Sequence, residues 1–348
     1  MSPFLKRLMI SLTIVISLIM CINYILDPLA FYRLPHMYEA QYSANARYQM
    51  PGLIKNVEFD TLIVGTSMSR NFVESDMNDI WDVKSFNASL PSATAREQLL
   101  AFELAARSNP DLENVLWELN FYSFARKPDD VEDSQGEFPY YMWDNALWND
   151  VRYLFSLYPL QRMREIILAN LRHDKSGRDI EMLYKFGMNA PTLTVEEVKE
   201  LIDIPNSVTK SQYQFDIMLA NFRENVIPAV RDNPKVKFYF FYPPYGVFWH
   251  VRAHKQNPDY LEGITQLKSA IYEELSLYNN VRLYDFQDRS DITHDISKYI
   301  DVAHYIPAIN LWTLEAIMTE KPVSSSTEAA SRAEAVKLQT LQYQLSSL

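Results

Sequence analysis

Glycine is scarce in this chain of 348 residues. The chain has seven glycines, where average usage would give about 24. With so few, neither the GxGxxG fingerprint nor a Walker loop can be written anywhere, so the common nucleotide-binding signatures are excluded. Each glycine that remains therefore carries more information than usual about where the backbone needs one.

The chain also has a single cysteine and fewer basic than acidic residues. The single cysteine, Cys21, lies in an apolar run, so the rest of the chain must fold without disulfides. The formal net charge is −11, and without residues 1–35 it is −13, from 30 basic and 43 acidic residues. A body this acidic repels phosphate backbones, which argues against a nucleic-acid partner. An apolar content of 48% is ample for a packed core.

One membrane-length apolar run stands near the amino end. Residues 8–26 would form a helix about 28 Å long, close to the thickness of the bilayer core. Lys6 and Arg7 precede the run and should hold residues 1–7 in the cytoplasm. This predicts a single-pass anchor in contact with membrane lipid, with the body on the far side. A cleaved signal peptide is the alternative, but its apolar region is normally shorter and no Ala-x-Ala site follows here.

Five short runs in the body are rich in β-branched or aromatic residues, as buried parallel strands are. Helical patterns alternate with them, including a Thr94-x-x-Glu97 capping box and the stretches 210–232 and 259–279. This alternation predicts an α/β fold, a doubly wound (flavodoxin-like) parallel sheet of about five strands with helices on both faces. The expected strands are 61–64, 83–86, 115–117, 236–242 and 281–286.

The stretch 125–205 interrupts the alternation. It is rich in Tyr and Trp, and helices are expected from Pro159 to about Arg172 and after a second capping box, Thr194-x-x-Glu197. We interpret it as one helical insertion between the third and fourth strands, lying over the carboxyl edge of the sheet. A separate small domain is the alternative.

The ends of the body are expected to be irregular. Residues 27–56 should form a juxtamembrane segment, extended over 36–56, that leads into an α/β domain at 57–320. Residues 321–348 are rich in Ser and Ala and should form a flexible tail. Its apolar residues could form a loose helix that packs; these are Val336, Leu338, Leu341 and Leu345.

A serine follows the first expected strand, in Gly65-Thr66-Ser67. Ligands bind at the carboxyl ends of parallel strands in open α/β sheets. Gly65 allows a sharp turn, and a helix from about Asn71 would point its amino end at the serine, which suits an acyl-transfer nucleophile. By itself the motif is weak, because a serine after a strand is more often a helix cap.

Six histidines are candidates for the base. His294 and His304 each follow an aspartate by three positions, Asp291 and Asp301, so that the carboxylate could orient the imidazole toward a serine. The other four fit less well. His36 is juxtamembrane, His173 lies in a charged cluster, and His250 and His254 share a helical spacing but lack a zincin glutamate and a third metal ligand.

The order of these motifs along the chain resembles the SGNH (GDSL-like) hydrolase superfamily. More narrowly, it resembles the membrane-anchored, exported SGNH-like proteins of bacteria that are linked to cell-surface polysaccharide. The order is strand-Gly-x-Ser, strand-Asn, strand-acid-x-Asn and a late Asp-x-x-His. The resemblance covers roughly residues 20–318 and rests on the segments 22–28, 64–72, 117–124, 242–245 and 299–307.

The resemblance implies roles for the site residues. Ser67 would be the nucleophile, His304 the general base and Asp301 the residue that orients it, since the His-Tyr-x-Pro context of the family falls at His304. The oxyanion donors of the family are the N–H of the nucleophile, a second-block glycine N–H and a third-block asparagine side chain. Here Asn120 supplies the asparagine, whereas Ala88 or Ser89 stands where the glycine would be.

Three further residues are candidates for substrate binding. Arg70 could hold an acidic substrate, or it could pair with Glu74. Tyr245 and Trp249 follow the fourth strand, and their rings would suit a sugar, although aromatic cover over a core is the default interpretation.

The resemblance implies a serine esterase or O-acyltransferase that acts on a cell-surface glycan, anchored in the bacterial cytoplasmic membrane with its body on the periplasmic or extracellular side. It would use no cofactor or metal. An acylated polysaccharide is the expected substrate, and a membrane acyltransferase is a candidate partner. The alternative is a catalytically inactive module of the same fold that binds glycan or a partner membrane enzyme, which the missing glycine supports. A metal enzyme built on His250 and His254 would need a third ligand.

Overall fold

The computed structural model describes residues 2–134, 136–144, 146, 148–203 and 213–343. The expected helical positions 210–212 and Leu345, and the expected end of the insertion at 204–205, lie outside these residues. The chain divides into two compact units. Unit 1 comprises Met1–Glu58, Leu104–Pro110 and Gly136–Tyr184, and unit 2 comprises Phe59–Glu103, Asp111–Gln135 and Lys185–Leu348.

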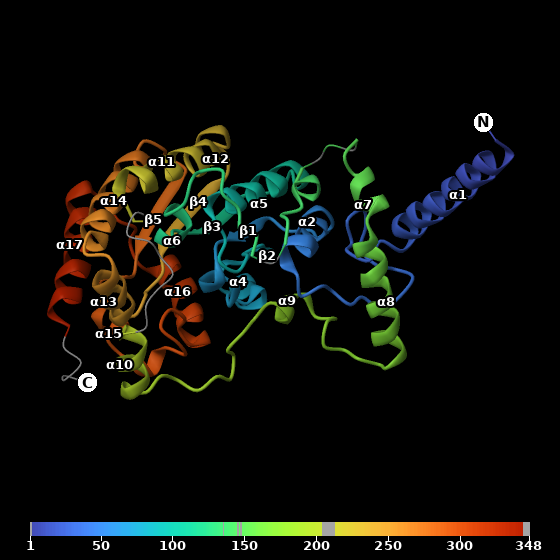
Figure 1. The fold of residues 1–348 in the computed structure, drawn as a ribbon. Coiled ribbons are helices and arrows are strands. Elements are labelled where there is room, and N and C mark those ends of the chain that lie inside the picture. The colour runs from blue at the N-terminus through green and yellow to red at the C-terminus, as the bar shows by residue number, and fades with distance from the viewer. Residues whose placement is uncertain (1, 135, 145, 147, 204–212, 344–348) are drawn as a thin grey trace. The chain divides into compact units, whose positions relative to one another are not determined.

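Unit 2 is built on a sheet of five parallel strands in the order β2-β1-β3-β4-β5 (Figure 1). This is the flavodoxin-like strand order, so the predicted fold is confirmed. All five expected strands are present, with ends shifted by no more than two residues. They are β1 Thr61–Val64, β2 Ser85–Asn87, β3 Asn114–Glu118, β4 Lys237–Tyr242 and β5 Val281–Asp285.

Helices cover both faces of this sheet because side chains alternate along each strand. On one face, Phe238 of β4 packs against Phe102 of α5 (Ala95–Ser108). On the other face, Tyr239 packs edge-on against Trp81 of α4 (Glu74–Trp81), whose indole N–H donates to the Leu314 carbonyl of α16 (Pro307–Thr319). The continuous apolar runs of the sequence are therefore explained by burial on two sides.

Both predicted capping boxes are formed. Thr94 N donates to Glu97 Oε2 at 2.9 Å, and Glu97 N donates back to Thr94 Oγ1 at 3.2 Å, at the start of α5. Thr194 and Glu197 make the same pair before α10 (Val195–Asp203). These reciprocal bonds satisfy backbone donors that a helix start leaves unpaired.

The stretch expected to be one helix up to residue 232 is split in two. Helix α11 (Phe215–Asn225) ends at Val226, and α12 (Ile227–Asp232) has Pro228 in its first turn, where a missing N–H costs nothing. The expected helix at 259–279 is α14 (Tyr260–Leu275). The remaining elements of unit 2 are α3 (Ser67–Arg70), α6 (Phe121–Phe124), α13 (Val247–Gln256), α15 (Ser290–Thr293) and η2 (Ile296–Lys298).

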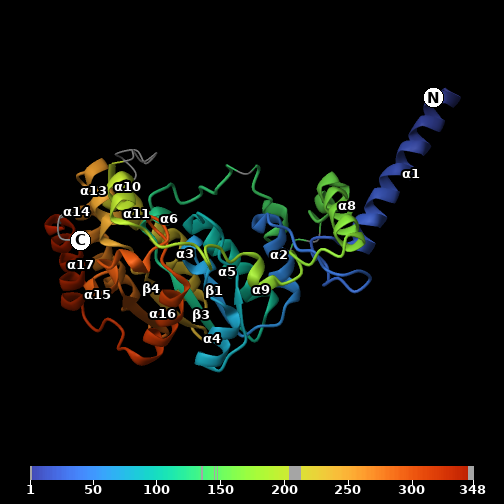
Figure 2. The same cartoon turned by 90° about the horizontal axis from the view of Figure 1, so that it is seen from below.

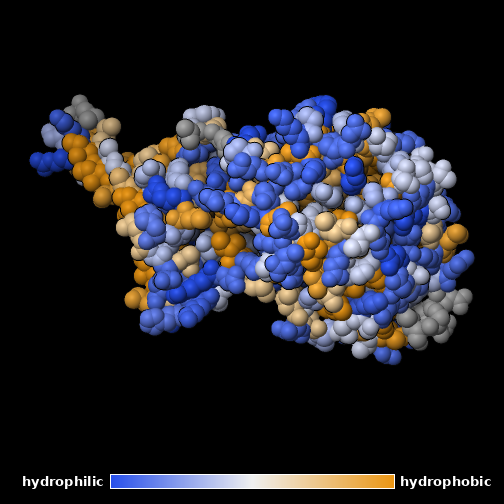
Figure 3. All heavy atoms as spheres, turned by 180° about the vertical axis from the view of Figure 1, so that it is seen from behind, coloured by the Kyte–Doolittle hydropathy of each residue, from blue (hydrophilic) through white to orange (hydrophobic). Residues whose placement is uncertain are grey.

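Unit 1 begins with α1 (Pro3–Leu26), and this is the one helix of the described residues that is long and apolar enough to cross a membrane. Its apolar side chains are exposed along most of its length, as the orange surface of the helix in Figure 3 shows. Its length and composition are consistent with a signal anchor or a signal sequence.

The juxtamembrane segment is folded, so the expectation of an extended chain at 36–56 is wrong. The Asp27 carboxylate accepts the backbone N–H groups of Phe31, Tyr32 and Arg33, which closes a tight turn after α1. Helix α2 (Ala46–Asn56) follows, with its apolar side chains in the core of unit 1. An acidic side chain that caps three N–H groups explains why the chain folds back here.

The stretch 125–205 is not one insertion over the sheet edge. Gly136–Tyr184 belongs to unit 1, while the chain from Lys185 belongs to unit 2. Asn23 of α1 donates to the carbonyls of Leu154 and Ser156, which ties the amino-terminal segment of unit 1 to Gly136–Tyr184. The elements of this stretch are η1 (Tyr140–Met142), α7 (Val151–Phe155), α8 (Leu157–Leu171) and α9 (Ile180–Leu183).

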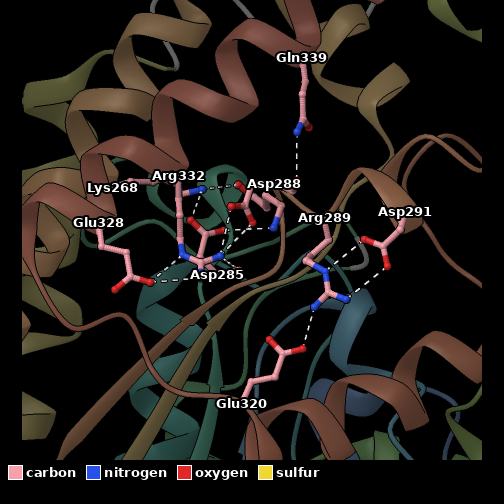
Figure 4. Close-up of polar contacts among 10 residues, drawn as sticks. Lys268, Asp285, Asp288, Arg289, Asp291, Glu320, Glu328, Arg332 and Gln339 are labelled. Carbon is pink, nitrogen blue, oxygen red and sulfur yellow. Dashed lines mark hydrogen bonds and ion pairs between the residues drawn. The ribbon is translucent and has the colours of Figure 1, made fainter.

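The carboxyl-terminal stretch is a packed helix, so the expectation of a flexible tail at 321–348 is wrong for its described part. Helix α17 (Ser326–Gln342) buries Ala329, Ala333 and Val336. Arg332 lies between the carboxylates of Glu328 and Asp288, at 3.1 Å from each (Figure 4). The small apolar residues on one face of α17 and the ion pairs of Arg332 hold the helix against the rest of unit 2. The Ser- and Ala-rich composition of the stretch did not indicate this packing.

Replacing Arg332 by Ala should loosen α17. Burial and the neighbouring Asp285 raise the pKa of Asp288, and Arg332 opposes this, so its loss leaves a poorly compensated carboxylate. We expect amide hydrogen exchange in α17 to accelerate by about tenfold, which corresponds to a loss of ~1.4 kcal/mol, a value between those of an exposed and a buried ion pair. The control is Arg231→Ala, whose pair with Asp232 is exposed. Equal exchange in both variants would contradict this docking role.

Candidate active site

The nucleophile candidate lies on a tight turn directly after β1. Thr66 caps α3, and Ser67 is the first residue of that helix, so the helix starts four residues before the expected position at Asn71. Gly65 is required here by close approach, because a Cβ would lie 2.5 Å from Ser69 Oγ and 2.6 Å from Glu118 Oε2. The Ser67 side chain is half-buried, at the carboxyl end of the central part of the sheet.

Ser67, His304 and Asp301 form a continuous hydrogen-bonded chain. Ser67 Oγ lies 2.8 Å from His304 Nε2, although 237 positions separate the two residues. His304 Nδ1 lies 2.7 Å from Asp301 Oδ2. A carboxylate can only accept, so Nδ1 carries the proton, and Nε2 is left to accept the serine hydroxyl. This is the geometry of a nucleophile, a base and an orienting acid.

The loop that carries Asp301 and His304 holds the carboxylate in place. Asp301 Oδ1 accepts the backbone N–H groups of Ala303 and His304, both at 2.8 Å. Burial by itself would raise the pKa of Asp301, but the hydrogen bonds and charge of His304 and these N–H groups lower it below its usual range. The acid therefore stays ionised and keeps its acceptors available.

A segment outside every sequence motif packs on the histidine. The Phe186 ring lies edge-on to the His304 ring, with centroids 4.9 Å apart. Asn71 fixes the Phe186 backbone through two bonds of 3.0 Å, one accepted by its side-chain oxygen and one donated by its amide. A phenylalanine in an irregular stretch carries no sequence signal for such a role.

Glu118, at the end of β3, is the acid of the strand-acid-x-Asn motif, and the sequence analysis gave it no role of its own. Its buried carboxylate accepts Thr66 N (2.9 Å), Thr66 Oγ1 (2.7 Å), Ser69 N (3.1 Å) and Ser69 Oγ (2.5 Å). It also accepts the Asn120 amide at 2.9 Å. Thr66 and Ser69 flank Ser67 on the same turn, so this carboxylate sets the position of the nucleophile. The available signal was a lone acid at the end of an otherwise apolar strand.

Most of the expected oxyanion donors are already engaged. Ala88 N donates to the Ile63 carbonyl at 2.9 Å, and Ser89 N donates to Asn87 Oδ1 at 3.1 Å. The Asn120 amide nitrogen is within hydrogen-bond distance of Glu118, Thr66 and Tyr245. It could reach an oxyanion only by giving up one of these acceptors.

Two polar groups of this region could each still donate a hydrogen bond. Ser67 N–H is the first of α3 and has no acceptor within that helix. The Ser89 hydroxyl is buried and has no hydrogen-bond partner in the described part of the chain. Ser89 follows β2 and lies near the turn that carries Ser67. The evidence is that the backbone N–H of the next residue, Leu90, donates to the Gly65 carbonyl of that turn.

The three expected substrate contacts differ in accessibility. Tyr245 is buried, burial raises its pKa well above the usual range, and its hydroxyl contacts the Asn120 amide. Trp249 is half-buried and stacks on Tyr245 with centroids 5.5 Å apart. Arg70 is half-buried at the end of α3, and Glu74, its expected partner in the alternative interpretation, pairs with Lys185 at 2.8 Å.

His294 and His250 have partners other than Ser67, and His250 Nδ1 lies 2.9 Å from the Tyr260 hydroxyl. His294 contacts the Thr293 hydroxyl and the Tyr343 ring, and it is His304 that meets Ser67. Burial, with a contribution from Lys268, lowers the pKa of His250 to about 3. The described residues contain no group of three or more His, Cys, Asp or Glu side chains that could hold a metal ion, so His250 and His254 lack a third ligand there.

No model of a known protein family matches the chain, and a search of curated proteins finds no match either.

Replacing Glu118 by Gln should displace the nucleophile. The Gln amide would place an N–H group next to the donors of Thr66 and Ser69, which need an acceptor. Each buried donor left unpaired would lower the stability of the fold by about 1–3 kcal/mol. We expect the rate at which a fluorophosphonate labels Ser67 to fall at least about tenfold. The matched control is Glu113→Gln, an exposed position just before β3. Equal labelling rates in the two variants would exclude the positioning role of Glu118.

The Asp301 carboxylate should stabilise the protein in a pH-dependent way. Its pKa is lowered in the folded state, so its contribution is complete above the value of 3.8 for an ordinary Asp and is lost as pH falls through the lower folded value. The melting-temperature difference between the wild type and Asp301→Asn should stay level above about pH 5 and shrink below it. A difference that stays constant down to pH 3 would show that Asp301 is not held as an ion.

Proposed function

We propose that this chain is a membrane-anchored serine esterase or O-acyltransferase of the SGNH type. The observation that carries the proposal is the 2.8 Å contact between Ser67 Oγ and His304 Nε2, with Asp301 on the other ring nitrogen. A serine, a histidine and an acid in this order of contact are the parts needed for acyl transfer. A cell-surface glycan as the acceptor or acylated substrate rests on the sequence resemblance.

The reaction proceeds in two balanced steps. In the first, Ser67 Oγ attacks the ester carbonyl carbon while its proton passes to His304 Nε2, and the same proton then goes to the departing alcohol oxygen as the old ester bond breaks. In the second, water or a sugar hydroxyl gives its proton to His304 Nε2 and attacks the acyl carbon, and His304 then passes that proton to Ser67 Oγ as the bond between the acyl carbon and Oγ breaks. Asp301 stabilises the imidazolium in both steps. Ser67 N–H faces no acceptor in α3 and is the oxyanion donor that the proposal requires.

A second candidate is a non-catalytic module of the same fold that binds glycan or a partner membrane enzyme. The specific observation in its favour is that expected oxyanion donors already make other hydrogen bonds. Ala88 N–H donates to the Ile63 carbonyl of β1. The Asn120 amide lies within hydrogen-bond distance of Glu118, Thr66 and Tyr245. A hydrolase of this type needs preorganised donors at the developing oxyanion. The two candidates therefore differ in whether Ser67 reacts.

The proposed location is the bacterial cytoplasmic membrane, with α1 as an uncleaved anchor and the body on the periplasmic or extracellular side. Lys6 and Arg7 at the start of α1 favour this orientation. Retention of the helix is supported by Asn23, which is buried and donates to the Leu154 and Ser156 carbonyls. Cleavage beyond α1 would remove Asn23 and leave this contact unmade.

The enzyme proposal predicts an ordering of variants in fluorophosphonate labelling of the full-length protein in detergent. Ser67→Ala should abolish labelling. His304→Ala and Asp301→Asn should each slow it by about 10³–10⁴-fold, and the double variant should be little worse, because the three groups act as one unit.

The control is His294→Ala, which should label within about twofold of the wild type. Labelling or esterase activity that survives Ser67→Ala would exclude the covalent mechanism. A folded wild-type protein that binds glycan but never reacts with the probe would favour the module.

The topology can be tested by reporters fused to the carboxyl terminus, after α17. A reporter that functions only outside the cytoplasm should be active, because the basic residues hold the amino end inside. Replacing Lys6 and Arg7 by Glu should reduce that activity. Activity of a reporter that works only in the cytoplasm would show that the orientation is wrong.

A further inference from the structure

Helix α8 of unit 1 carries a mainly apolar stripe, formed by the exposed Leu157, Ile167 and Leu171, the half-buried Leu160 and the exposed Arg164. These positions recur every three or four residues, so they share one side of the helix. Leu157 is 62% exposed, Ile167 51% and Leu171 73%. Large aliphatic residues repeated on one exposed side are unusual for a surface that faces only water.

The core of unit 1 does not account for this stripe. Helix α8 already has a separate buried face, made by Pro159, Met163 and Ile166. Its apolar surface is thus wider than packing needs, and the excess points away from the unit. A shallow groove of about 580 Å³ beside α8, lined by Met37, Ile167 and Leu171 among others, extends the same apolar surface.

The position of α8 next to α1 indicates what covers the stripe. Asn23, in the last turn of α1, donates to the carbonyls of Leu154 and Ser156, which are the junction between α7 and α8. Tyr153 of α7 donates to the Asp27 carboxylate at 2.8 Å. In both Figure 1 and Figure 2, α8 lies by the inner end of α1. A membrane crossed by α1 would therefore end at the level of this junction.

Aromatic and basic residues of the same region match a lipid interface. Phe155 at the end of α7 and Trp148, three residues before α7, are exposed, and aromatic rings are enriched at the depth of lipid headgroups. Residues 148–175 contain five basic and three acidic residues, in a body whose net charge is −13. Arg164 in the middle of the stripe can lay its stem on the acyl chains and reach the phosphates with its guanidinium.

We propose that the α8 stripe lies in the interfacial layer of the leaflet in which α1 ends, and that its partner is the lipid surface. Unit 1 then contacts the membrane through two helices: α1 spans the bilayer, and α8 lies on its surface near the end of α1. The proposal rests on the anchor role of α1 and is independent of the chemistry at Ser67. Lipid is the occupant favoured here, because the contacts of Asn23 and Tyr153 keep α8 at the end of the spanning helix.

The test measures quenching of an environment-sensitive label by lipids that carry a nitroxide high on the acyl chain. Full-length protein is reconstituted in vesicles of phosphatidylethanolamine and phosphatidylglycerol. One sample is labelled at the native Cys21, which is exposed on α1. The others carry Cys21→Ser with one new cysteine: Ile167→Cys on the stripe, Glu165→Cys on another side of α8, or Leu277→Cys, exposed in unit 2.

The labels at Cys21 and at position 167 should be quenched several-fold more than those at positions 165 and 277. Quenching at Cys21 with none above the position-277 level at position 167 would overturn the surface helix while the anchor stands, and would leave a partner protein as the occupant of the stripe. An unquenched label at Cys21 would overturn the anchor and this proposal together. Labelling of Ser67 by a fluorophosphonate in the same vesicles reports separately on the enzyme proposal.

Discussion

The buried carboxylate of Glu118 is the interaction on which the geometry of the site depends. It gathers the N–H and hydroxyl groups of Thr66 and Ser69 and the amide of Asn120, and so joins the turn after β1 to the end of β3. A buried anion is costly unless donors surround it, and here five do. Gly65 is the complement of this arrangement, because any side chain there would collide with the carboxylate.

The site combines a complete chain of proton-handling groups with few free oxyanion donors. Ser67, His304 and Asp301 meet at 2.7–2.8 Å. The same network that orders the Ser67 turn engages the Asn120 amide, and the sheet engages Ala88 N–H. Positioning of the nucleophile and stabilisation of the oxyanion therefore draw on overlapping donors. This competition is why the proposed reaction depends so strongly on Ser67 N–H.

In unit 1, polar contacts at the end of an apolar helix organise the rest. Asn23 and Asp27 bind backbone and side-chain groups of residues 153–156, more than 120 positions away. Buried polar groups need specific partners, so these contacts select one arrangement of α7 and α8 against α1. These contacts of Asn23 and Asp27 are the reason for the proposed position of the α8 stripe at the lipid surface.

The sequence alone determined the features that depend on neighbours along the chain. The apolar runs predicted five strands, and two capping boxes predicted helix starts. The spacing of Asp-x-x-His left His294 and His304 as alternatives, and only the family resemblance favoured His304. The tertiary structure decided whatever depends on contacts between distant residues. These include the five donors around Glu118, the engaged amide of Asn120, the packing of Gly136–Tyr184 with the amino-terminal segment, and the docking of α17 by Arg332. The physical reason is that periodicity records which side of an element is buried, whereas the partner of a buried polar group is chosen only when the chain has folded.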